Sequence, residues 1–189
     1  VVAAIHPSLA GSGEVIKKAT TPVGAGLKPA LGEGTRSLDE QVYVGLLAYA
    51  LDTSEGEGLI GRLRMPPRWA TVVRDTIALK GKLPWLSDAE LSPAQLYEAL
   101  APSTPAAVQA YALATPSEEA RQHLSLFLEK LRHVKPSLGG RDLIELGVPQ
   151  GPAIGEMLVR LRSARLEGTV INRSEEEALV KDRLTTQAG

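Results

Sequence analysis

Three helix starts of the same kind follow one another in this chain and restrict its fold class. Ser92-Pro93, Thr104-Pro105 and Thr115-Pro116 each place a possible capping hydroxyl directly before a proline. Proline suits the first helical position, because its φ is already helical and the N–H that it lacks would have no partner there. The middle of the chain is therefore predicted to form short, successive helices.

The remaining apolar segments also follow the helical repeat. Further helices are predicted over 38–52, from Thr53 or Ser54 to Met65, from Pro67, briefly after Asp142, over 152–166 and from Ser174, with Leu83–Asp88 as a turn. Segment 38–52 is apolar on nearly every face, which predicts that it lies at the centre of the core. No pair of strand patterns occurs. The predicted fold is all-α, an irregular array of about eight to ten short helices without a sheet.

Three regions are predicted along the chain. Residues 1–36 contain the end of a helix and a Gly-rich loop, residues 37–135 a helical body and residues 136–189 a helical tail. The chain starts without Met in the middle of an apolar pattern, so we expect a piece of a longer protein. No signal peptide and no membrane-spanning run are predicted.

Composition excludes several classes of protein. The chain contains no Cys and three scattered His, and its formal net charge is -1. A disulfide framework and thiolate metal sites are therefore excluded, and a reducing cytoplasm is the expected compartment. The chain also lacks the Asp-x-Asp pair with which nucleotidyl-transfer enzymes share Mg²⁺. We predict no catalytic residue and no metal site, and do not expect this piece to be an enzyme by itself.

The most basic segment is Gly61–Lys82. It carries one acid, Asp75, against six cations: Arg62, Arg64, Arg68, Arg74, Lys80 and Lys82. Such a patch attracts phosphate groups, and each contact would make binding weaker as salt rises. The alternative is a solvated helix face on which the arginine stems cover apolar surface.

The segment Gly139–Glu156 predicts a short helix, a tight turn and a second helix. Gly147 ends the first helix and Gly151-Pro152 starts the second. Gly151 and Gly155 leave backbone N–H groups open to a phosphate, or else they only turn the chain and pack the helices. Arg160 and Arg162 flank the apolar face of the second helix, where they either follow an RNA backbone or rim the core.

The stretch GRDLIELGVPQGPAIGEMLVRLRSARLEGTVINRSEEE resembles the C-terminal region of the tRNA nucleotidyltransferase/poly(A) polymerase family, the bacterial-type class II CCA-adding and A-adding enzymes. The shared features are Gly140-Arg141-Asp142-Leu143, Gly147, Gly151-Pro152, Ile154-Gly155 and Gly168. Leu91–Leu100 resembles the body of these enzymes, and Ala3–Leu9 resembles the end of their neck.

The resemblance implies a body and tail that hold the acceptor and T arms of tRNA while a catalytic head extends the RNA 3' end. Mg²⁺ and CTP or ATP are implied for that head, and no cofactor for this part. The implied partners are tRNA or another RNA 3' end and the protein's own head and neck, without a membrane. The candidate RNA-binding residues are Arg62, Arg64, Arg68, Arg74, Lys80, Lys82, Arg141, Gly151, Gly155, Arg160 and Arg162.

Two other functions fit the same residues. Leu143–Leu158 has the outline of a helix-hairpin-helix DNA-binding module. A purely structural or dimerising helical domain would use the glycines for packing and leave the arginines in solvent. The sequence leaves open the oligomeric state and the choice among CCA, A-only and poly(A) addition.

Overall fold

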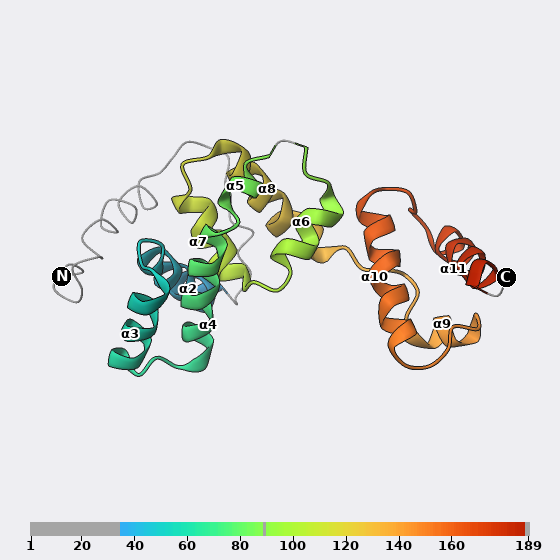
Figure 1. Ribbon diagram of the computed structural model, residues 1–189, viewed down its shortest axis with the longest axis horizontal. Coiled ribbons are helices and arrows are strands. Elements are labelled where there is room, and N and C mark those ends of the chain that lie inside the picture. The colour runs from blue at the N-terminus through green and yellow to red at the C-terminus, as the bar shows by residue number, and fades with distance from the viewer. Residues whose placement is uncertain (1–34, 89, 188–189) are drawn as a thin grey trace. The chain divides into compact units, whose positions relative to one another are not determined.

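The computed structural model describes residues 35–88 and 90–187, in which every regular element is a helix (Figure 1). The all-α prediction is confirmed for these residues. The Gly-rich loop and nearly all of the predicted region 1–36 lie outside them. The helices are α2 (Thr35–Ala48), α3 (Thr53–Leu63), α4 (Pro67–Lys80), α5 (Leu83–Leu86), α6 (Pro93–Leu100), α7 (Pro105–Ala114), α8 (Glu118–Glu129), the 3-10 turn η3 (Leu131–His133), α9 (Gly140–Glu145), α10 (Pro152–Leu166) and α11 (Arg173–Gln187).

The chain folds into two compact units. Of the described residues, the first unit takes those up to Glu90 together with Leu100–Leu128, and the second takes Leu91–Ala99 together with those from Glu129 to Gln187. Nearly all of α6 thus belongs with α9, α10 and α11, although more than thirty residues separate it from α9 in the sequence.

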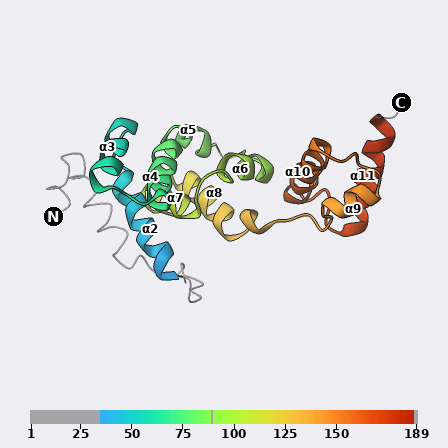
Figure 2. The same cartoon turned by 90° about the horizontal axis from the view of Figure 1, so that it is seen from below.

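The first unit is built on mutual packing of α2, α4 and α7, which lie side by side in both views (Figures 1 and 2). The most enclosed of the three is α7, because its small side chains let the other two helices approach closely. Its buried residues are Ala106, Ala107, Val108, Ala110, Tyr111 and Ala112. The prediction that the α2 segment lies at the centre of the core agrees with this packing: the helix contacts both α7 and α4, and Val42, Leu46 and Ala48 are buried, although Tyr43 is 48% exposed.

Close approach of α2 and α7 occurs at Gly45. A Cβ atom placed on this glycine would lie 2.6 Å from the Cβ of Ala110 and 3.2 Å from the hydroxyl of Thr76. The Thr76 hydroxyl is itself buried and donates to the carbonyl of Val72, at 2.8 Å. The absence of a side chain at position 45 therefore sets the distance between these helices.

Several helix boundaries in the first unit differ from the prediction. Helix α2 spans Thr35–Ala48 and not 38–52, and α8 begins at Glu118 and not at Pro116, because the hydroxyl of Ser117 accepts the N–H of Ala120 at 3.1 Å and caps the helix there. Asp52 caps α3, in place of Thr53 or Ser54: its carboxylate accepts the N–H of Glu55 at 2.8 Å, while the Glu55 carboxylate accepts the N–H of Asp52 at 3.0 Å. This reciprocal arrangement satisfies two amides that the helix leaves unpaired. The predicted turn after Lys82 contains the short helix α5.

The second unit has its own core, to which residues 138–161 contribute most of the side chains. Its buried residues are Leu138, Leu143, Val148, Met157, Leu161 and Val180. The predicted apolar face of α10 is confirmed, because Ile154 and Leu158 pack against this core beside the buried Met157 and Leu161. Helix α11 begins at Arg173, one residue before the predicted Ser174, because Asn172 accepts the N–H of Glu175 at 2.9 Å.

Replacing Gly45 by alanine tests the helix crossing. We expect Gly45→Ala to lower the free energy of unfolding by roughly 1–3 kcal/mol, since the added methyl group overpacks the α2–α7 contact. Gly58 of α3 is the matched control, because a Cβ there meets nothing within 4 Å. Gly58→Ala should raise stability by roughly 0.5–1 kcal/mol through helix propensity alone. Urea denaturation of both variants measures the difference, and equal effects would contradict the close crossing.

Candidate functional site

The turn between α3 and α4 carries three exposed arginines. Arg62 lies in the last turn of α3, Arg64 directly follows that helix, and Arg68 lies in the first turn of α4. None of their side chains bonds to or pairs with a residue in the described part of the chain. No Asp or Glu occurs between Gly58 and Arg74. We call residues 62–68 the arginine tip. Among the predicted RNA-binding residues, its three arginines form the densest group of cations without a partner among the described residues.

Arg64 has an unusual backbone conformation. With φ 46° and ψ 49° it is left-handed, and within the described residues it is the only residue other than glycine with a positive φ. Its N–H donates to the carbonyl of Gly61, so this conformation ends α3. Glycine is the usual residue at such a position, since a side chain there costs about 1 kcal/mol. A strained position that keeps a long cation is a reason to look for a role of that side chain.

The other cations of the basic segment have partners within the fold. Arg74 donates from Nε and Nη2 to the two carboxylate oxygens of Glu57, at 2.6 and 2.8 Å, and so bridges α4 to α3. This hydrogen bonding lowers the pKa of Glu57 and raises that of Arg74. Lys80 donates to the carbonyl of Leu51 over the ring of Tyr49, and its pKa is lowered, mainly by burial. Lys82 is half-buried.

In the second unit, Asp142 of the predicted motif holds the fold together. Its carboxylate accepts the N–H of Gly139 at 2.6 Å, which starts α9, and the guanidinium of Arg173 at 2.7 Å, which joins α9 to the start of α11. These interactions, that with Gly139 first, lower the pKa of Asp142. Arg141 beside it is exposed.

The glycines around the α9–α10 turn have different roles. Gly147 and Gly151 have φ values of 99° and 115°, so both turn the chain through conformations that other residues avoid. Gly155 is helical and exposed, and a Cβ placed on it would meet nothing within 4 Å. Packing of the two helices therefore does not require glycine at position 155.

The two candidate arginines of α10 lie in different surroundings. Arg162 is half-buried, with its guanidinium 5.1 Å from the ring centroid of Tyr97 in a cation–π contact. Arg160 is exposed and, together with Arg183 of α11, lines an open hollow of about 580 Å³. Glu98 and Asp182 line the same hollow, so it has no excess of positive charge.

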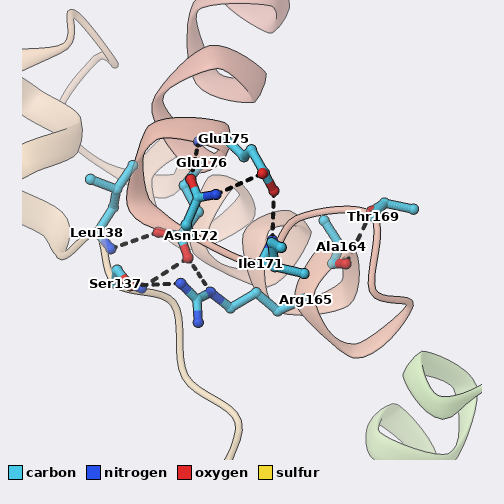
Figure 3. Close-up of polar contacts among 9 residues, drawn as sticks. All are labelled: Ser137, Leu138, Ala164, Arg165, Thr169, Ile171, Asn172, Glu175 and Glu176. Carbon is cyan, nitrogen blue, oxygen red and sulfur yellow. Dashed lines mark hydrogen bonds and ion pairs between the residues drawn. The ribbon is translucent and has the colours of Figure 1, made fainter.

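Glu176 is the central polar residue of the second unit, and the sequence interpretation did not single it out. Its carboxylate is fully buried and accepts the N–H groups of Ser137 and Leu138, at 2.9 and 2.8 Å, and the guanidinium of Arg165 (Figure 3). Arg165 also donates to the hydroxyl of Ser137, at 2.6 Å. This network fastens the segment before α9 to α10 and α11, so Arg165 acts in the fold.

Glu175, Glu176 and Glu177 form an acidic run at the start of α11, where the helix dipole favours acids, and the outer two bind groups at the helix start. Glu175 accepts the N–H of Ile171 at 2.8 Å and Glu177 pairs with Arg173 at 3.1 Å (Figure 3 shows Glu175). Glu176 differs because it points into the unit. Its signal in the sequence was position, since it lies four residues before the buried Val180 and so faces the core.

Within residues 35–88 and 90–187, no group of three or more His, Asp or Glu side chains is arranged to hold a metal ion. None of the described helices combines the length and apolar character needed to cross a membrane.

Two known proteins are similar to parts of this chain, and both are A-adding tRNA nucleotidyltransferases. The one from Geobacter sulfurreducens is 40% identical over 62 residues, which are 33% of this chain and 7% of the relative. The one from Halalkalibacterium halodurans is 35% identical over 81 residues, which are 43% of this chain and 18% of the relative. No protein-family model and no solved structure matches. The predicted resemblance is confirmed to this extent: parts of this chain are similar in sequence to A-adding tRNA nucleotidyltransferases, of whose length the chain spans less than a fifth.

Removing the charge of Glu176 tests the buried network. Glu176→Gln should lower the free energy of unfolding by on the order of 3 kcal/mol, because it leaves Arg165 without its anion. Glu177→Gln is the matched control, and it should change stability by less than about 1 kcal/mol because its ion pair is at the surface. Chemical denaturation at neutral pH measures both.

The difference in stability between wild type and Glu176→Gln is expected to depend on pH. Burial alone would raise the pKa of Glu176, but the hydrogen bonds from Ser137, Leu138 and Arg165 outweigh it and the pKa is lowered. A lowered pKa in the folded state stabilises the protein above the ordinary glutamate pKa, and this contribution is lost as pH falls through the lowered value. The stability difference between wild type and Glu176→Gln should therefore be constant above about pH 4.5 and shrink below it. A difference that grows on acidification would contradict the network.

Proposed function

We propose that this chain binds RNA through the arginine tip and that the RNA is tRNA. The observation that carries the proposal is the cluster of three exposed arginines without partners, one of them held in a left-handed conformation. A guanidinium group donates two parallel N–H bonds to a phosphate, which makes arginine well suited to an RNA backbone. The names of the two similar proteins and the Gly139–Glu156 motif support tRNA as the particular RNA.

The proposed role is that of the body and tail of a tRNA nucleotidyltransferase. The chain would hold the acceptor and T arms while a catalytic head, with its own Mg²⁺ and CTP or ATP, adds nucleotides to the 3' end in the cytoplasm. A-form RNA is recognised mainly by its shape and its phosphates, since its major groove is too narrow for side chains. Exposed arginines at the turn between two helices that the Arg74–Glu57 ion pair joins suit this kind of contact.

Arg141, Gly151, Gly155 and Arg160 remain candidates for a second RNA contact on the other unit. All four are exposed. Arg74, Lys80, Lys82 and Arg162 are weaker candidates, because contacts within the fold or partial burial already engage them.

A second candidate function, binding of duplex DNA, is favoured by the turn between α9 and α10. The positive φ angles of Gly147 and Gly151 give this pair the tight connection of a helix-hairpin-helix module. Competition between duplex DNA and tRNA for the chain separates the two functions. Displacement of tRNA by equal amounts of duplex DNA would favour the DNA-binding module.

Removing the three charges of the arginine tip tests the main proposal. The variant in which Arg62, Arg64 and Arg68 are all changed to Gln should bind tRNA more weakly. The slope of the logarithm of the binding constant against the logarithm of KCl concentration should become shallower by about two to three, because up to three phosphate contacts are lost. Fluorescence anisotropy with labelled tRNA measures this slope.

The matched control for that variant changes Lys130, Arg132 and Lys181 to Gln. These three cations are exposed, and none of their side chains has an ion-pair partner in the described chain. The control has the same net charge as the tip variant and should bind tRNA almost as wild type does. An equal loss in both proteins would mean that binding follows overall charge, and the tip would not be the site.

The strained backbone at Arg64 permits a test in which stability and binding change in opposite directions. Arg64→Gly should raise the free energy of unfolding by about 0.5–1 kcal/mol, because glycine adopts the left-handed conformation without cost. The same variant should weaken tRNA binding, since it removes a phosphate contact. Arg64→Ala is the control and should weaken binding without the gain in stability. An Arg64→Gly protein that binds tRNA as tightly as wild type would contradict a role for this side chain.

A further inference from the structure

Leu63 is the apolar residue at the centre of the arginine tip. It is 52% exposed, more than any other large apolar side chain described in the first unit. The core beneath the tip is already filled, because Leu59 of the same helix is 3% exposed and Met65 packs against the cluster that Leu59 forms with Leu51. Leu63 is therefore turned away from the core of its own unit.

The neighbours of Leu63 define what its exposed surface can meet. Arg62 and Arg64 flank it directly and Arg68 follows across the turn, all without partners. A partner that reaches Leu63 must therefore present anionic groups around an apolar surface. An acidic protein surface and a nucleic acid both have anions, but guanidinium groups also stack on nucleobases, which favours a nucleic acid.

An unbroken RNA duplex offers little to a leucine side chain. Its outer surface consists of phosphates and 2'-hydroxyl groups, and its base faces are stacked inside. An unpaired base, in contrast, exposes a flat apolar face beside the phosphates of its own strand. Packing of Leu63 on such a face removes apolar area from water on both partners.

We propose that Leu63 packs against the face of an unpaired base while the arginines of the tip bind the phosphates on either side of that base. This inference rests on the proposed RNA-binding function of the tip. It narrows the ligand to RNA in which a loop or a bulge interrupts a duplex. Leu63 then determines specificity for RNA structure, and the arginines supply the affinity that depends on salt.

The test uses the whole chain and two RNA probes, a blunt duplex and the same duplex with one bulged adenosine. Wild type should bind the bulged duplex about 5- to 10-fold more tightly, as burial of the exposed half of a leucine side chain allows. Leu63→Gln keeps the charge and approximate size of the side chain and should bind both probes equally. Its dependence on KCl should equal that of wild type, because no phosphate contact is lost.

Two further variants control for effects on folding. Leu113→Gln changes a leucine of α7 that is 36% exposed and distant from the tip in sequence, and it should keep the preference for the bulge. Leu63→Met keeps an apolar side chain and should keep most of the preference. If both Leu63→Met and Leu113→Gln lose the preference for the bulged duplex, the loss reflects disturbed folding. That result would overturn the role of Leu63.

The outcomes for the two proposals are distinct. Equal binding of both probes by wild type, or a preference that survives in Leu63→Gln, overturns the role of Leu63 while the arginine tip remains an RNA contact. Unchanged binding by the variant in which Arg62, Arg64 and Arg68 are replaced overturns the proposed function of the tip, whatever the bulge preference. Failure of wild type to bind either probe or tRNA overturns both.

Discussion

A chain made of many short helices must find partners for the backbone groups at many helix ends. The first N–H groups and last carbonyls of each helix have no partner within it, so in a six-residue helix such as α9 almost every group depends on something outside. Side chains supply these partners at five starts, through Asp52, Ser92, Ser117, Asp142 and Asn172. Glu176 extends the same solution to a segment without helical structure, where a buried carboxylate accepts two backbone N–H groups. Polar side chains thus hold the connections, and the apolar faces pack between them.

The arginines fall into two groups, those that bind a carboxylate within the fold and those that do not. Arg74, Arg165 and Arg173 each bind a carboxylate on another helix, which fixes the helices relative to each other within one unit. The arginines of the tip have no such task, and the segment around them contains no acid with which they could form one. Their charge therefore remains in solvent, where it attracts polyanions over distances up to about the Debye length, which shortens as the salt concentration rises. The net charge of the whole chain gives no sign of this division, because the paired and unpaired cations count equally.

Prediction from the sequence was most successful where the determinant is local. Prolines at the first helical position predicted the starts of α4, α6, α7 and α10, because the ring restricts φ to a helical value. The same rule failed at Pro116, which lies two residues before α8, since Ser117 caps that helix. The buried face of α10 followed from the spacing of its apolar residues. The enclosed position of α7 was missed, because alanines carry little apolar signal and are buried by the close approach of neighbours such as Gly45. Glu176 was missed because a buried carboxylate is recognised by its partners, and these lie 11 to 39 residues away.

By itself the sequence determined that the chain is helical, where most helices begin and which segment carries the excess of positive charge. These properties depend on bond geometry, capping and charge within a few residues. The tertiary structure decided which cations hold the fold and which stay free, and it placed Leu63 outside the core between two free arginines. Those outcomes depend on which distant side chains come within hydrogen-bonding distance, and a linear pattern does not contain these distances because the chain sets them only when its helices pack.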